Sequence, residues 1–548
     1  MGILKASLKD YVYYALPILI TGFAYGWENG SLGGILAMPQ FLDYFGNPSA
    51  FRQGVLTAGL QAGEFGGSLI LGFLFADRLG RRRTILIGLA IYLVGQVILV
   101  ASVSQPQFIA ARVINGFGAG ALFQTMSLYT AEIAPPQIRG QMTACLNTGI
   151  GLGLLVTYWV QYGTSNLSGG AAWRLPLGLQ IVPAVIVAIQ VFFRPESPRW
   201  LVRHDRSREA LEVLAKLHGK GDTENSFVQT EFQEILVAVE YEREMKASTP
   251  SYPQLIFGKK YRRRTALGVG AQFLQQISGP NIVLYYASKV FAQTGASGTQ
   301  ATLLANGIGS ALLFAATLHL NIMMDTYGRR KPLIFGPFAM GVCLIIVGSM
   351  LVSYGSPYFD PVTQGVNFSF KNASAGHAAI AFMFLYEVFF GGFYSSVPWT
   401  YPNEVWGVEA RGRGTALSTA TNWFCNFWFG LYIPTALNEA SWKLYYIFGG
   451  ICICISLVSY LFFPETSNRS LEELELLFLP NRTAFVFLDK EARTKRKLLS
   501  HGLDEGAGNA AKELELALGI HHGDIDDVEA AKGNTSFLER QQMDGDKA

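Results

Sequence analysis

The chain has 548 residues, of which 50% are hydrophobic, 13% are aromatic and only 15% are charged, and its formal net charge is +3. Soluble domains usually carry about 25% charged residues, so this composition argues against a soluble enzyme. It also argues against a nucleic-acid-binding protein, since the few basic residues are scattered in short clusters. The five cysteines form no CxxC pair, so we expect neither a disulfide framework nor a metal site.

The charges lie between apolar runs of about 20 residues, the length that crosses a hydrocarbon core of ~30 Å. This pattern predicts an all-α polytopic membrane protein with twelve transmembrane helices. The predicted spans are 13–35, 54–76, 84–104, 106–130, 140–162, 174–193, 265–292, 300–324, 332–353, 377–401, 414–436 and 442–463.

These spans divide the chain into four parts. We expect two six-helix bundles at 1–193 and 265–463, joined by a cytoplasmic helical linker at 194–264. Residues 464–548 form a polar tail whose composition is typical of disorder.

Basic residues set the predicted orientation. They gather in the short loops after even-numbered spans, which the positive-inside rule places in the cytoplasm together with both termini. Three sequons then face outside and are glycosylation candidates, at Asn166, Asn367 and Asn372.

The first-span sequence Tyr25-Gly26-Trp27-Glu28 places a carboxylate inside the membrane, which is costly and therefore indicates function. Arg112, in the fourth span, is its natural partner. Glu387, in the tenth span, is a second lone acid that could line a cavity or sit hydrated near the outer end. His319, in the eighth span, is expected to be a packing histidine.

The seventh span contains an unusual concentration of uncharged polar side chains. Gln275, Gln276, Asn281 and Tyr285 surround the dipeptide Gly279-Pro280, which should break the helix. Because amides both donate and accept hydrogen bonds, this pattern predicts a binding site for a neutral solute rich in hydroxyl groups.

Three motifs occur twice in the same order. Asp77 to Arg82 corresponds to Asp325 to Arg330. Glu132, followed seven residues later by Arg139-Gly140, corresponds to Glu404, followed seven residues later by Arg411-Gly412. Pro195-Glu196-Ser197 likewise corresponds to Pro464-Glu465-Thr466. The repeats indicate two homologous halves, an arrangement that houses the substrate at its interface in many secondary transporters.

With Pro398-Trp399 and Asn422-Trp423, these motifs resemble the sugar porter family of the major facilitator superfamily over about residues 10–475, and most closely the fungal hexose and polyol transporters. The resemblance implies a major facilitator fold with two pseudo-symmetric six-helix bundles and alternating access to a central site. The residues that it assigns to a monosaccharide or polyol are Gln275, Gln276, Asn281, Trp399 and Asn422, to which we add Tyr285. Asn426, one helical turn from Asn422, can face the same cavity.

The resemblance also implies a cytoplasmic gate of charged residues, which hold the inner side shut when the site faces out. The assigned residues are Asp77, Arg81, Glu132, Arg139, Glu196, Asp325, Arg329, Glu404, Arg411 and Glu465. One departure concerns the fifth span, where Leu154 stands at the position of a sugar-contacting Gln in many relatives.

Proton coupling is expected to run through Glu28 and Arg112, with the proton as coupling ion and without any cofactor. The expected protein is a plasma-membrane symporter that works as a monomer. Its expected partners are the lipid bilayer and its sugar or polyol solute, and we expect it to bind no nucleic acid. An uncoupled uniporter and a nutrient sensor that signals through its tail remain alternatives. The substrate stays open among hexoses, pentoses, disaccharides, glycerol, inositol and quinate-like acids.

Overall fold

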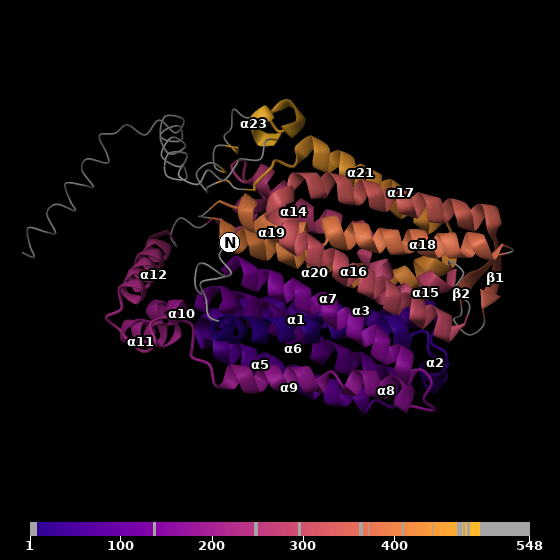
Figure 1. Ribbon diagram of the computed structural model, residues 1–548, viewed down its shortest axis with the longest axis horizontal. Helices are drawn as coiled ribbons and strands as arrows, with labels where there is room; N and C mark the ends of the chain where they lie inside the picture. The colour runs from indigo at the N-terminus through magenta and orange to yellow at the C-terminus, as the bar shows by residue number, and fades with distance from the viewer. Residues whose placement is uncertain are drawn as a thin grey trace, which may run out of the picture.

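The computed structural model describes residues 8–134, 139–245, 250–293, 298–360, 365–370, 372–407, 410–440, 442–467, 469, 474, 477–478 and 483–493. Almost all of these residues are helical, and the helices run side by side along the long axis of the molecule (Figure 1). Most of the predicted tail lies outside the described residues. Four predicted site residues also have side chains outside the described part of the structure, namely Arg139, Tyr285, Asp325 and Asn367.

The first half builds six crossings, and two of them are interrupted. Its elements are α1 (Leu8–Ile35), α2 (Pro39–Tyr44), α3 (Ala50–Gly67), η1 (Ser68–Phe75), α4 (Ala76–Leu79), α5 (Arg81–Val100), α6 (Gln105–Ile133), α7 (Arg139–Thr164), α8 (Ala171–Gly178) and α9 (Ile181–Phe192).

The second half also builds six crossings. Its elements are α14 (Arg262–Ile277), α15 (Pro280–Gln293), α16 (Thr299–Tyr327), α17 (Arg330–Tyr354), α18 (Ala373–Phe389), η2 (Phe390–Tyr394), α19 (Val397–Val405), α20 (Arg411–Ala440) and α21 (Trp442–Phe462). The strands β1 (Gly355–Asp360) and β2 (Gly365–Phe370) form an antiparallel hairpin that the sequence analysis did not predict.

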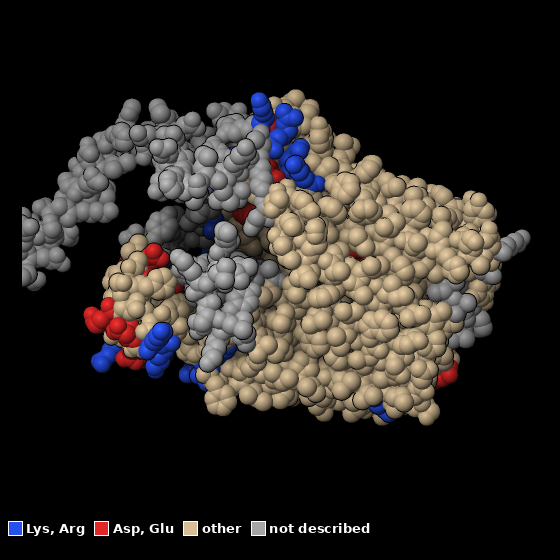
Figure 2. All heavy atoms as spheres, in the orientation of Figure 1, with Lys and Arg blue, Asp and Glu red and all other residues tan. Residues whose placement is uncertain are grey.

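Six helical segments among the described residues are long and apolar enough by themselves to span a membrane. They are Arg81–Val100, Ala171–Phe192, Thr299–Met324, Arg330–Tyr354, Ala373–Val405 and Trp442–Phe462. Other crossings carry buried polar groups, such as Glu28 in α1, Glu64 in α3 and Arg112 in α6, which lower their hydropathy. Figure 2 shows a side of the bundle almost without charge, with most charged residues gathered at the end that carries α11 and α12.

Glycines bring α1 and α7 into backbone contact. Gly22, Gly26 and Gly30 recur every four residues on one face of α1, as in other close pairs of membrane helices. A Cβ atom at Gly26 would lie 2.0 Å from the carbonyl oxygen of Ile150, so no larger residue fits. The contact thereby fixes α1 against α7, and Glu28, two residues from Gly26 and so on another side of the helix, meets Arg112 of α6.

A second glycine stripe joins α3 to α6. A Cβ atom at Gly63 would lie 2.2 Å from the Val113 carbonyl oxygen, and one at Gly120 would lie 2.2 Å from that of Glu64. The two helices therefore touch along the stretch that contains Arg112.

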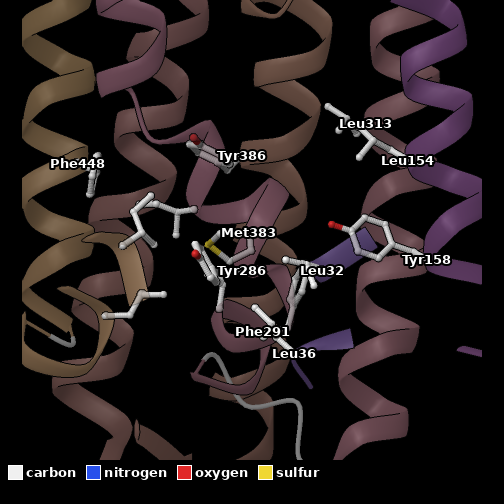
Figure 3. Packing of buried hydrophobic residues seen from close by; sticks show 14 of the residues in the cluster. Leu32, Leu36, Leu154, Tyr158, Tyr286, Phe291, Leu313, Met383, Tyr386 and Phe448 are labelled. Carbon is white, nitrogen blue, oxygen red and sulfur yellow. The ribbon is translucent and has the colours of Figure 1, made fainter. Parts of the chain in front are cut away.

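The two halves meet tightly at the end that carries the β1–β2 hairpin, here called the hairpin end. One apolar cluster includes Leu32 of α1 and Tyr158 of α7 from the first half, with Tyr286 and Phe291 of α15 from the second (Figure 3). The Ser288 hydroxyl also donates a hydrogen bond across the interface to the Gly33 carbonyl. The halves are therefore packed shut at this end.

The opposite end, here called the linker end, carries a small helical domain beside the first half (Figure 1). It consists of α10 (Pro198–Arg203), α11 (Ser207–His218) and α12 (Ser226–Met245), which share their own apolar core. The short helix α13 (Tyr252–Phe257) then leads to α14, and the last described elements are η3 (Val486–Leu488) and α23 (Lys490–Arg493).

His218 fastens this domain to the end of α6. Its Nδ1 lies 2.6 Å from the Glu231 carboxylate, and its Nε2 lies 3.1 Å from the Ile133 carbonyl oxygen. The ring contacts α12 through one nitrogen and α6 through the other. The linker is thus tied directly to the helix that bears Arg112.

We expect Gly26→Ala to destabilise the protein by about 1–3 kcal/mol, because the added methyl group must push α1 away from α7. The thermal unfolding midpoint of the detergent-purified protein measures this effect. Gly450→Ala in α21 is the matched control, since a Cβ atom there meets nothing within 4 Å. An equal midpoint in the two variants would contradict the role given to the glycine stripe.

Candidate functional site

The predicted break in the seventh span is present. α14 ends at Ile277 and α15 begins at Pro280, and Gly279 between them has a φ of 95°. This left-handed conformation is one that glycine adopts without strain. The break places the last turn of α14 and the first turn of α15 around the same point.

Five buried amides are joined there by hydrogen bonds. Asn422 of α20 accepts from Gln276 Nε2 at 3.0 Å, and its Nδ2 donates to Gln272 Oε1 at 2.6 Å and to Gln275 Oε1 at 3.3 Å. Asn281 Nδ2 completes the group by donating to Gln276 Oε1. The structure thus brings together four predicted sugar-binding residues, and it adds Gln272, which the sequence analysis missed.

The amide group is also anchored to the interrupted tenth span. Gln275 Nε2 donates to the Ser395 carbonyl at 2.8 Å, and Gln272 Nε2 donates to the Pro398 carbonyl at 2.9 Å. Every one of these bonds joins uncharged groups. A solute hydroxyl can replace either partner, because it also donates and accepts.

Four aromatic rings lie beside the amides and connect the two halves. Tyr25 and Phe123 of the first half have centroids 4.4 Å apart, and Trp399 and Trp423 of the second half have centroids 6.3 Å apart. The ring of contacts is closed by Tyr25 with Trp423 at 6.1 Å and by Phe123 with Trp399 at 6.3 Å. We call Tyr25, Phe123, Trp399 and Trp423 the aromatic cage. Such rings offer apolar faces to the C–H groups of a bound solute.

Glu28 and Arg112 form an ion pair in the interior of the first half. Arg112 Nη1 donates to the Glu28 carboxylate, and the Tyr92 hydroxyl donates to its other oxygen at 3.3 Å. Glu28 is 0% exposed and Arg112 is 1% exposed. Separating such a pair without replacing the lost partner is costly, so the pair must be exchanged or hydrated if it opens.

Within the predicted spans, two buried charged residues were not singled out from the sequence. Glu64 of α3 is 0% exposed, and its two carboxylate oxygens meet no hydrogen-bond donor of good geometry in the described part of the chain. Lys289 of α15 is 7% exposed, and its Nζ likewise bonds none of the described residues. A charged residue inside a predicted span is the signal that identified Glu28, and it applies equally to both.

The repeated charged motifs form matching clusters. In the first half, Arg81 bonds Glu132 at 2.9 Å and Asp77 at 2.8 Å, while Glu196 accepts from the backbone N–H of Arg82 at 3.1 Å.

In the second half, Arg329 bonds Glu404 at 2.8 Å, and Glu465 accepts from the backbone N–H groups of Arg329 and Arg330 at 2.8 and 3.1 Å. Arg411 is half-buried at the start of α20. Each of these bonds joins elements of one half, so the clusters stiffen the halves, and their expected part in closing the inner side stays a prediction.

The remaining predicted positions lie around this centre. Leu154 is buried in α7, where Gln161, two turns further on, donates to the Ser31 carbonyl at 2.6 Å. Glu387 is 5% exposed and faces Gly309 of α16, so it is enclosed within the second half. His319 lies on the exposed side of α16, with Nε2 2.9 Å from the Tyr327 hydroxyl.

The family model described as "Sugar (and other) transporter" matches residues 14–478. The chain belongs to this sugar transporter family of the major facilitator superfamily. It is therefore a membrane transporter and not an enzyme.

Curated relatives cover most of the chain. A high-affinity glucose transporter of Kluyveromyces lactis is 34% identical over 85% of this chain and 84% of its own length. The MFS glucose transporter mfs1 of Aspergillus flavus is also 34% identical, over 88% of this chain and 93% of its own.

Solved structures share the fold. The inward-open xylose transporter XylE from E. coli superposes with a TM-score of 0.67 at 23% identity, covering 84% of this chain and 98% of its own. The proton:xylose symporter XylE bound to 6-bromo-6-deoxy-D-glucose also gives 0.67, at 24% identity over 86% of this chain and all of its own. The twelve-helix, two-bundle architecture predicted from the sequence is confirmed.

We expect Gln276→Ala to raise the KM for sugar uptake by about 2–10-fold, the equivalent of losing roughly 0.5–1.5 kcal/mol from one neutral hydrogen bond. Uptake kinetics, normalised to transporter at the cell surface, measure this change. Thr421→Ala is the control, because its hydroxyl bonds only the Leu417 carbonyl of its own helix. A normal KM in Gln276→Ala would remove this residue from the binding site.

Proposed function

We propose that the protein moves a monosaccharide or a related polyol across the plasma membrane by alternating access, in symport with protons. The observation that carries the proposal is the buried amide group around Asn422, placed beside the aromatic cage at the interface of the halves. Neutral amides and apolar rings match the hydroxyl and C–H groups of a sugar and offer nothing specific to a charged solute.

A hexose such as glucose is the first candidate. Both curated relatives described above are named glucose transporters, and each covers more than four-fifths of the chain. The amides can bind a hexose by exchanging their hydrogen bonds to one another for hydrogen bonds to its hydroxyl groups. Bonds such as Gln276 to Asn422 open as solute hydroxyls replace them, so the buried polar groups keep partners throughout.

Proton coupling rests on the ion pair of Glu28 and Arg112. Protonation of Glu28 would release the guanidinium, and the change in pairing would favour the conformation that binds solute. The related fold of the proton:xylose symporter XylE supports this proposal. An uncoupled uniporter would keep the pair as a permanent structural bond.

The proposed orientation places the linker end and both termini in the cytoplasm, because the Arg-rich motifs of both halves lie there. The hairpin end then faces outside. Asn166 and Asn372 are exposed at that end and are available for glycosylation.

Uptake in a host without its own sugar transporters tests both parts of the proposal. A panel of hexoses, pentoses, polyols and a disaccharide is added in turn to weakly buffered cells, while labelled uptake and external pH are recorded. We expect hexose uptake with alkalinisation of the medium. Uptake without a pH change would replace symport with facilitated diffusion, and no uptake of any panel member would contradict sugar transport.

Glu28→Gln should abolish uphill accumulation while it spares exchange of labelled for unlabelled sugar, because the amide cannot carry the coupled proton. Accumulation ratios and counterflow are measured in the same cells. Glu209→Gln, an exposed position of α11 that pairs with Arg206, is the control and should accumulate sugar normally. Full accumulation by Glu28→Gln would refute this role.

A further inference from the structure

A second acid lies next to the Glu28–Arg112 pair. Glu64 projects from α3, which packs on α6 along the glycine stripe. The Arg112 guanidinium and the Glu28 carboxylate both lie close enough to act on it electrostatically. Tyr25 and Asn29 of α1 approach its carboxyl group, but neither Glu64 oxygen has a hydrogen bond of good geometry.

The charges in this cluster do not balance when all three groups are ionised. Two carboxylates and one guanidinium would leave a net charge of −1 in a region where Glu28 and Glu64 are 0% exposed and Arg112 is 1% exposed. An uncompensated buried charge costs several kcal/mol. One proton restores neutrality, and Glu64 is the acid without a paired cation, because Arg112 Nη1 is bonded to Glu28.

We propose that Glu64 is a second proton-carrying residue of the transporter, which holds the transported proton while Arg112 is paired with Glu28. This inference rests on the proposed proton coupling. In the step that loads the site, the proton binds a Glu64 carboxylate oxygen and converts the carboxylate to the neutral acid. Release passes the same proton through Glu28 to water, and Arg112 remains charged throughout.

Arg112 has a donor to spare for the deprotonated acid. Its Nε is buried and has no hydrogen-bond partner among the described residues, so it is available to a Glu64 carboxylate while Nη1 keeps Glu28. The cluster then consists of one cation between two anions, which is stable only when water reaches it. The buried arrangement is therefore favoured with the proton bound.

Tyr25 links this cluster to the solute. Its ring forms part of the aromatic cage, with Phe123 at 4.4 Å and Trp423 at 6.1 Å, and its side chain also approaches Glu64. A sugar that displaces the Tyr25 ring thereby changes the surroundings of the acid. This contact offers a direct physical route from solute binding to proton binding.

The test is Glu64→Gln, measured by the number of protons taken up per sugar and by the dependence of uptake on external pH. We expect the proton-to-sugar ratio to fall at least tenfold and the pH dependence to flatten, while counterflow of labelled sugar continues. Ser68→Ala, one turn further along the same chain segment, is the control, because among the described residues its hydroxyl bonds the Phe65 carbonyl alone. An unchanged ratio in Glu64→Gln would overturn the inference.

Two further measurements keep the outcome clear. Glu64→Met, whose side chain is of similar length and cannot carry a proton, serves if the Gln variant does not reach the membrane, and its ratio is read in the same way. Wild-type protein without sugar-driven proton uptake would refute the proposed coupling itself. A coupled wild type with an uncoupled Glu28→Gln and a coupled Glu64→Gln would refute only the role of Glu64.

Discussion

The burial of one guanidinium inside a membrane helix bundle constrains the whole first half. Arg112 can stay charged there only if carboxylates come close, and these must be supplied by other helices because its own helix offers none nearby. The glycine stripe between α3 and α6 brings Glu64 close by letting the two backbones touch, and the glycines of α1 fix the helix of Glu28 against α7. Larger residues at these glycines would shift both carboxylates relative to Arg112.

The second half places uncharged amides, rather than charged groups, at the corresponding depth in the membrane. Its broken helix carries amides that bond to one another and to the carbonyls of Ser395 and Pro398, without any charge. Neutral hydrogen bonds are worth about 1 kcal/mol each and can be exchanged with a solute at little net cost. The proposed proton chemistry and the proposed solute recognition thus lie in different halves, and they meet at the aromatic cage, where Tyr25 contacts Trp423.

Much of this arrangement could be predicted from the sequence, since the spans, the repeat and the pairing of Glu28 with Arg112 all follow from spacing and the cost of buried charge. The partners of individual amides could not, because polar residues on several faces of α14 leave its orientation open. Gln272 was missed for this reason, since only packing against α20 shows that it meets Asn422. The hairpin was missed because short strands in a loop give no periodic signal over so few residues.

The charged clusters at the linker end bear on how the halves move. Arg81 with Glu132 and Arg329 with Glu404 each join elements of one half, so these bonds can stay intact while the halves rock. What must then change is the apolar cluster at the hairpin end and the contacts of the aromatic cage. Those contacts are non-directional, so a modest rotation can replace them with lipid, water or solute, and water can take the place of the Gly33 carbonyl that accepts from Ser288. Because the halves are rigid and the contacts between them are mostly non-directional, the small free energy of solute binding can drive a large conformational change.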